Sequence, residues 1–359
     1  MFKFLSLNKK NNPDLLIFLP IIFLIIIGIF GIFSISMRID GKYDFLIKKH
    51  LIFCFVGIIM IIYFSKISIK NLIFSSIILF TISFTLSIAT IFFFPETKGA
   101  SRWIKLFNFS LQPTEILKPS FVILSSLLLG RYNNKKDFSF LLNIILFGLI
   151  SLILLSQPDF GMFILFFCVW ILQVLNSNLE KKIIFPILGF FFLTFILSYL
   201  FIDHVRFRID NFLFPNIGDN YQITKSLDSF KSGGFSGKGI GEGIVSKNLP
   251  DSHSDFIYAL IGEEFGSIFA LIILVLYIIP YIRVHLICQK SSNLFVITSL
   301  TGLSNIFLFQ TIINISSSLN IIPTKGMTLP FVSYGGSSLV SSAMIISFIL
   351  ILIREDRNE

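Results

Sequence analysis

Apolar runs of about 20 residues recur along almost the whole chain and are separated by short polar segments. A helical run of this length crosses a hydrocarbon core of roughly 30 Å. The pattern predicts an all-α polytopic membrane protein in which residues 1–359 form a single membrane domain. We expect about ten spans, at 14–36, 46–64, 71–94, 114–130, 138–156, 160–176, 183–202, 255–282, 293–316 and 331–353.

The longest polar interruption is a large loop at about 203–254, before the eighth span. Its glycine-rich centre is not a P-loop, because Lys238 is followed by Gly239 where Ser or Thr is needed. It is not a Rossmann turn either, because no strand precedes it. Two alternatives stay open: a flexible surface loop, and a lid whose backbone approaches a substrate closely.

Composition supports the membrane assignment and adds a charge argument. The chain is 54% hydrophobic, contains 45 Phe and has a mean hydropathy of +0.86, which excludes a soluble domain of this size. In the short loops, Lys and Arg are more frequent on the side of the membrane that holds the termini. Cytoplasmic loops carry an excess of these residues, so both termini are expected in the cytoplasm and the large loop outside. The cations that remain outside suit an anionic ligand, although snorkelling at the membrane interface explains each of them equally well.

The segment SHSDFIYALIGEEFG, residues 252–266, places a carboxylate at the outer end of the eighth predicted span. On a helix that begins near Asp255, Ala259, Gly262 and Gly266 share one face and allow close packing. Asp255 therefore lies at the end of a packed seam and can meet an external substrate. The alternative for Asp255 is a helix N-cap, a role that the preceding serine can also fill.

The same segment holds two further carboxylates: Glu263 lies about 80° around this helix from Asp255, and Glu264 lies on the far side. They lie deeper and cannot form one cluster with it. We expect this pair to hold neighbouring helices through buried polar contacts.

A second group of charged and aromatic residues lies in KGASRWIKLFNFSLQPTEILKPS, residues 98–120. Glu115 and Lys118 are spaced i,i+3, so they either neutralise each other or leave Lys118 available for a phosphate. Trp103, next to Arg102, is either a membrane-interface residue or a platform for a sugar ring.

A third polar segment, IIPTKGMTLPFVSYGGSSL, covers residues 321–339. Two prolines break the backbone, Lys325 lies in the outer loop, and Ser333 precedes the last span. Irregular backbone at membrane depth is tolerated where it lines a wet cavity, so we expect a cavity wall here.

These segments, together with QPDFG at 157–161 and SFKSGGFSGKGIGEG at 229–243, resemble the SEDS family of integral-membrane glycan polymerases. The resemblance covers almost the whole chain and is closer to the division member FtsW than to the elongation member RodA. It implies a SEDS-type fold and a peptidoglycan glycosyltransferase that polymerises lipid II outside the cytoplasmic membrane, for septal synthesis. An elongation role is the alternative within the family.

The resemblance also implies roles for individual residues and partners. Asp255 matches the essential aspartate of the large outer loop, and substrate-binding positions match Trp103, Lys118 and Lys325, with Arg102 and Glu115 beside them; Ser333 is a further candidate. The expected partners are lipid II, a class B penicillin-binding protein and other divisome membrane proteins, with no nucleic acid.

In the expected mechanism, Asp255 takes the proton of the acceptor hydroxyl, because an Asp is ionised at neutral pH. No partner carboxylate at glycosidase-type spacing is evident in the sequence, which favours a single inverting step. Lys118, Arg102, Lys325 or a divalent cation (Mg²⁺ or Mn²⁺) would stabilise the departing undecaprenyl pyrophosphate. The rival functions are a lipid II flippase and a scaffold without catalysis.

Overall fold

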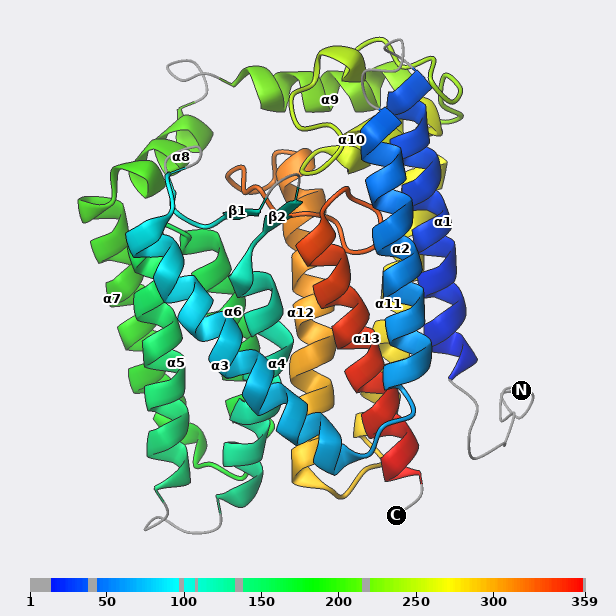
Figure 1. Cartoon of the computed structure of the whole chain (residues 1–359). Coiled ribbons are helices and arrows are strands. Elements are labelled where there is room, and N and C mark those ends of the chain that lie inside the picture. The colour runs from blue at the N-terminus through cyan, green and yellow to red at the C-terminus, as the bar shows by residue number, and fades with distance from the viewer. Residues whose placement is uncertain are drawn as a thin grey trace.

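The structure is a computed structural model that describes residues 14–37, 44–96, 100–106, 109–132, 138–214 and 220–357. Parts of the polar segment at 98–120, residues 98–99 and 107–108, lie outside this range. The described chain is a bundle of long helices with smaller elements gathered at one end (Figure 1).

Eight helices of the described chain are long and apolar enough to cross a membrane, which confirms an all-α, multi-pass membrane fold. Two more helices match predicted spans but differ in character. Helix α4 (Pro113–Arg131) carries buried charges, and α6 (Phe160–Leu175) has only 16 residues. The expected count of ten therefore stays a prediction. The eight are α1 (Leu15–Met37), α2 (Asp44–Phe64), α3 (Ile69–Phe93), α5 (Ser139–Ser156), α7 (Ile184–Phe201, with a 3-10 turn at Lys181–Ile183), α11 (Gly266–Cys288), α12 (Leu294–Ser318) and α13 (Gly336–Asp356).

Helices α12 and α13 lie at the centre of the bundle, and α7 lies at its edge. The apolar stretch of α13 is 89% buried, against 6% for α7. Helix α13 is covered by α2, α4 and α12, whereas α7 contacts only α6, α8 and its own first turn among the larger contacts. The exposed apolar side chains of α7 suit contact with lipid.

Buried polar side chains join α4 to α5 and α6. The Asn143 amide donates to the Ser125 hydroxyl (2.9 Å) and accepts from the Trp170 indole (2.5 Å). The Gln173 amide donates to the Ser126 hydroxyl at 2.7 Å. These bonds connect α4, α5 and α6 where water cannot satisfy polar groups.

The expected single span at 255–282 is wrong, because the chain breaks between a short helix α10 (Ile257–Glu264) and α11. Gly266 has a φ of +84°, a backbone conformation that favours glycine. A Cβ at this position would lie 2.2 Å from the Phe235 carbonyl oxygen of the large loop. Close packing of the loop and the left-handed backbone together end α10.

The last span also begins later than expected. Residues 331–335 form turns, and α13 starts only at Gly336. Its N-terminal glycine lies against the Phe53 ring of α2, where a Cβ would come within 2.3 Å.

The large loop contains regular secondary structure. It contains α8 (Asp203–Leu213), α9 (Tyr221–Gly233) and a 3-10 turn at Ser246–Asn248. Helix α9 crosses the end of the bundle and packs on α10 (Figure 1). The predicted small-residue seam explains the close approach, since a Cβ on Gly262 would lie 2.4 Å from the Phe230 ring. The partner of the seam is therefore α9, from the large loop.

Glu263 and Glu264 hold the glycine-rich stretch in place. Glu263 accepts hydrogen bonds from three consecutive backbone amides, those of residues 244–246, at 2.7–3.0 Å. Glu264 accepts from the Ser34 hydroxyl of α1 (2.6 Å) and from the Gly241 amide (3.1 Å). Buried contacts were expected for this pair, and the segment that they mainly hold is the loop.

The ends of three helices meet at the opposite end of the bundle. The Asp14 carboxylate accepts from Arg283 of α11 at 2.9 and 3.0 Å, and from Arg357 just after α13. The start of α1 and the end of α13 therefore lie side by side, away from α8, α9 and α10 (Figure 1).

Candidate functional site

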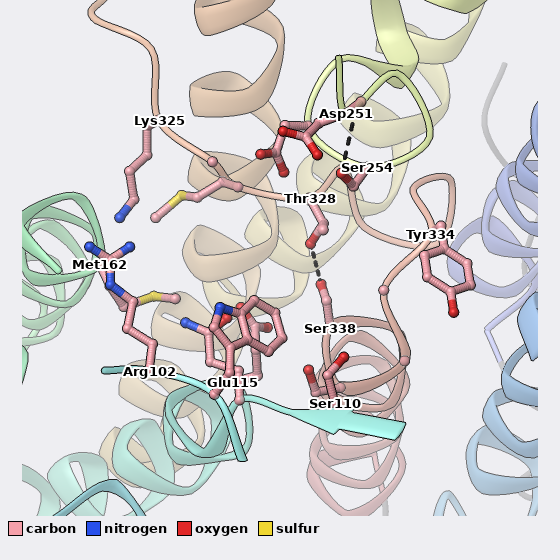
Figure 2. A pocket seen from close by; sticks show the side chains of 18 of the residues that line it. Arg102, Ser110, Glu115, Met162, Asp251, Ser254, Lys325, Thr328, Tyr334 and Ser338 are labelled. Carbon is pink, nitrogen blue, oxygen red and sulfur yellow. Dashed lines mark hydrogen bonds between the residues drawn. The ribbon is translucent and has the colours of Figure 1, made fainter. Parts of the chain in front are cut away.

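A cavity of about 520 Å³ lies at the end of the bundle that carries α8, α9 and α10. Its walls come from segments far apart in the sequence: the chain around 102–115, the start of α6, helix α8, the turn at 251–256, and residues 324–338. Figure 2 shows Arg102 and Lys325 on one side, with Asp251 and Ser254 on the turn across from them. Five of the seven candidate residues line it: Arg102, Trp103, Glu115, Asp255 and Lys325.

A small β-hairpin carries one wall of the cavity. Strands β1 (Ile104–Leu106) and β2 (Phe109–Leu111) pair antiparallel, with Lys105 opposite Ser110. Both of these residues line the cavity, and Trp103 precedes β1. The hairpin leads directly into Pro113, which suits the first turn of α4. Whether Trp103 contacts a sugar stays a prediction.

Asp159, directly before α6, is the centre of a charged cluster. Its carboxylate, 1% exposed, forms an ion pair with the Lys325 amino group and lies 3.5 Å from Arg102 Nε. It also accepts from the Met162 amide at 3.2 Å as the N-cap of α6. Burial alone would raise the pKa of Asp159, but Lys325 and Arg102 more than offset this and hold it below its usual value.

The two cations of this cluster are fixed in place. Arg102 donates to the carbonyl oxygens of Gln157 (3.2 Å) and Pro158. The stem of Lys325 lies against Gly161, where a Cβ would come within 2.3 Å of it. Burial lowers the pKa of Lys325 to about 8, although the Asp159 carboxylate acts in the opposite direction.

Arg208 brings a third cation from α8 to the same wall. Its guanidinium donates to the Thr324 carbonyl oxygen at 3.1 Å and lines the cavity. Burial, followed by repulsion from Arg102, lowers its pKa. Three cations against the one Asp159 carboxylate give this wall a net positive charge, which suits a ligand with phosphate groups.

Asp255 lies on the turn that precedes α10 and lines the same cavity. A Cβ on Gly326 would lie 2.9 Å from Asp255 Oδ2, so the backbone of the Lys325 loop passes directly beside the carboxylate. Asp251 lines the cavity from the same turn and has a φ of +53°. It is a second carboxylate near Asp255 that the sequence analysis left out.

Lys118 is buried beside the cavity and is not among the residues that line it. Its amino group lies 2.7 Å from Glu115 Oε2 and donates to the Gln310 carboxamide at 2.6 Å. This is the mutual neutralisation weighed as one of two alternatives for the pair. Direct contact of Lys118 with a phosphate stays a prediction.

Ser333, 3% exposed, also lies outside the lining. Its hydroxyl donates to the Ser254 carbonyl oxygen at 2.5 Å and accepts from the Leu329 amide at 2.8 Å. Because the hydroxyl is used within the protein, the geometry favours a positioning role over substrate contact.

A metal site built only from protein ligands is not evident in the described chain, where no group of three or more His, Cys, Asp or Glu residues is close enough to hold an ion. The acidic residues on the cavity wall are Glu115, Asp159, Asp251 and Asp255. Asp159 is engaged by cations and Glu115 by Lys118. Mg²⁺ is often held by one or two carboxylates together with substrate phosphates, and the turn at 251–255 carries two carboxylates that line the cavity.

Comparison with known proteins identifies the family. A model of the cell cycle protein family that groups FtsW, RodA and SpoVE matches residues 14–358. The chain belongs to this family. The SEDS family that the sequence motifs indicated is therefore confirmed, as is a multi-pass membrane protein.

Curated relatives are similar over most of their length. A protein of Caulobacter vibrioides named probable peptidoglycan glycosyltransferase FtsW is 31% identical over 322 residues, which cover 88% of this chain and 81% of that protein. A protein of Wigglesworthia glossinidia brevipalpis with the same name is 32% identical and covers 97% and 96%. These names agree with the FtsW-like character of the motifs.

Solved structures share the fold. A chain from a peptidoglycan synthase complex, described for its coordination of polymerization and crosslinking, superposes with a TM-score of 0.76, 21% identity, and coverage of 94% of this chain and 98% of that chain. The rod shape determining protein RodA of Thermus thermophilus gives a TM-score of 0.72 at 20% identity, with coverage of 97% and 99%.

Proposed function

We propose that this chain is a peptidoglycan glycosyltransferase of the FtsW type, which polymerises lipid II into glycan strands for septal synthesis. The single observation that carries the proposal is the cavity that Asp255 lines together with Arg102, Arg208 and Lys325. The names of its curated relatives, probable peptidoglycan glycosyltransferase FtsW, support the same activity.

The positive wall would hold the pyrophosphate of the donor lipid. The glycosidic C1–O bond to pyrophosphate breaks as the acceptor 4-hydroxyl oxygen bonds to C1, and undecaprenyl pyrophosphate leaves with the bonding electrons. Negative charge grows on the leaving group, and fixed cations in a site shielded from water stabilise that charge. Arg102 and Lys325 are suited to this task because Asp159 and backbone carbonyls orient them before the substrate binds.

Asp255 would act as the general base. Its carboxylate would accept the proton of the acceptor hydroxyl as the new bond forms, in a single inverting step. Asp251, with oxygens of the bound pyrophosphate, would hold Mg²⁺ or Mn²⁺, and such an ion would add positive charge at the leaving group. No further cofactor is proposed.

The proposed topology combines the arrangement of the helix ends with the distribution of loop cations. The cavity lies at the end of the bundle opposite the start of α1 and the end of α13. With both termini in the cytoplasm, as the short-loop cations favour, the cavity faces the outside of the cytoplasmic membrane. The proposed partner is a class B penicillin-binding protein, which would cross-link the new strand; a resemblance to a chain from a synthase complex supports it. Other divisome membrane proteins are proposed on the family resemblance alone.

Polymerisation of labelled lipid II by the purified protein tests the proposal. Wild type and Asp255→Asn are compared with and without the candidate partner, and with a chelator of divalent cations. Glycan ladders from wild type and none from Asp255→Asn, with both proteins equally folded, support the proposal. Ladders from both proteins remove Asp255 from the mechanism. Absence of product, in an assay where a related polymerase works, favours the flippase or the scaffold.

A further inference from the structure

The turn that carries Asp255 is held through three consecutive backbone carbonyls. The His253 carbonyl accepts from the Tyr334 amide at 2.9 Å, and the Ser254 carbonyl accepts from the Ser333 hydroxyl at 2.5 Å. The Asp255 carbonyl accepts from the Asn314 carboxamide at 2.9 Å. Each donor comes from outside the turn, so the position of Asp255 depends on α12 and on the segment that precedes α13.

The same two side chains also hold the loop on the other side of the carboxylate. Asn314 donates its second N–H to the Met327 carbonyl at 2.6 Å, and the Ser333 hydroxyl accepts from the Leu329 amide at 2.8 Å. Asn314 is fully buried. Two side chains therefore fix the spacing between Asp255 and residues 325–329, where the cationic wall begins.

We infer that Asn314 and Ser333 are positioning residues that fix Asp255 against the Lys325 loop. The inference rests on the proposed glycosyltransferase function. Neither side chain lines the cavity, so neither is expected to contact the substrate. Both act on Asp255 through its backbone. Displacement of a catalytic group by about 1 Å can reduce a rate by roughly 100-fold.

The test compares Asn314→Leu and Ser333→Ala with matched controls from the same bundle. Asn305→Leu removes a buried carboxamide of α12 that donates to Thr301 of its own helix, and Ser304→Ala removes a hydroxyl that also bonds Thr301. Leucine keeps the approximate volume of asparagine and removes its donors. The controls therefore report the general cost of losing a buried polar group from this helix.

The expected kinetic result for Asn314→Leu is a kcat about 10- to 100-fold below wild type, with the affinity for lipid II within about threefold. Ser333→Ala is expected to lower kcat by a smaller factor, because the Ser333 hydroxyl holds the carbonyl of the neighbouring Ser254 and not that of Asp255 itself. The controls should keep kcat within about threefold. A kcat near wild type in Asn314→Leu, or a loss confined to lipid II affinity, overturns the inference.

A second measurement does not depend on activity. Amide hydrogen exchange is followed in peptides that cover 251–258 and 326–334, in all four variants and in wild type. Exchange should accelerate in both peptides for Asn314→Leu and Ser333→Ala, and not in the controls. Unchanged exchange overturns the positioning role even where the proposed function holds. If exchange is faster in Asn314→Leu and Ser333→Ala but wild type polymerises no lipid II, the positioning role is supported and the proposed function is overturned.

Discussion

The reduced pKa of Lys325 predicts how the proposed reaction depends on pH. Burial lowers this pKa to about 8, so the amino group is charged at neutral pH and becomes neutral as the pH rises through that value. The cationic wall then loses one of its three charges. Substrate capture, measured as kcat/KM, should therefore fall with increasing pH through a midpoint near 8.

The size of the fall follows from the typical energy of a charge next to a phosphate. A unit charge at about 4 Å from a phosphate contributes roughly 4 kcal/mol at an effective dielectric constant of about 20. Loss of hydration offsets part of this, and net values for hydrogen bonds to charged groups are about 1.5–3 kcal/mol. Since about 1.4 kcal/mol corresponds to a tenfold change, kcat/KM should fall by roughly 10- to 100-fold. Arg102 and Arg208 remain charged and set the lower plateau.

The assay is initial-rate polymerisation of lipid II at subsaturating substrate between pH 6.5 and 10, in wild type, Lys325→Arg and Lys231→Arg. Arginine stays protonated over this range, so the kcat/KM of Lys325→Arg should not fall near pH 8. This expectation holds even if the variant is slower than wild type at every pH. Lys231, an exposed lysine of α9 outside the cavity, is the matched control and should keep it. The reasoning is refuted by a fall with the same midpoint in Lys325→Arg, or by a flat wild-type profile.

Three further predictions concern the surroundings of the cavity. Gly326→Ala should lower kcat at least tenfold while Tm stays within a few degrees, because a Cβ would lie 2.9 Å from Asp255 Oδ2; an active variant would contradict the close approach. Glu263→Gln should speed proteolysis within residues 234–246, with little change in the Tm of the membrane bundle, since its hydrogen bonds to three amides, about 1.5–3 kcal/mol each with a charged acceptor, fall to about 0.5–1.5 kcal/mol with a neutral one. Lys118→Met should lower Tm by leaving a buried unpaired Glu115, and adding Glu115→Gln should restore part of the loss; a further drop would contradict mutual neutralisation.

The length of the apolar runs was enough to predict the helical membrane fold, because a bilayer leaves few other ways to satisfy the backbone. The same signal failed at 255–282, where apolar residues continue through the break at Gly266. The break depends on a positive φ and on contact with the distant Phe235, and neither leaves a trace in hydropathy. The strands of the hairpin, with three residues each, are too short for any periodic pattern to reveal.

The candidate site was predicted where chemistry is concentrated in short polar segments, as at Asp255 and Lys325. Asp159 was missed because the sequence around it indicates only a turn between two spans. Its role depends on Lys325, which is 166 residues away in the chain, and on Arg102. Arg208 was missed for a related reason, since its helix lies in a segment that reads as a loop in the sequence.

The sharing of one carboxylate by two cations constrains how this chain can change over evolution. Arg102 and Lys325 reach Asp159 from separate segments, so loss of Asp159 leaves two cations without their counter-charge, and loss of either cation changes the net charge of the cluster. Sequence drift at these positions should therefore be concerted. A chimera that takes only the hairpin segment from a distant relative should function only where the donor segment also suits the recipient's α6 cap and outer loop. These three pieces would have to be exchanged together.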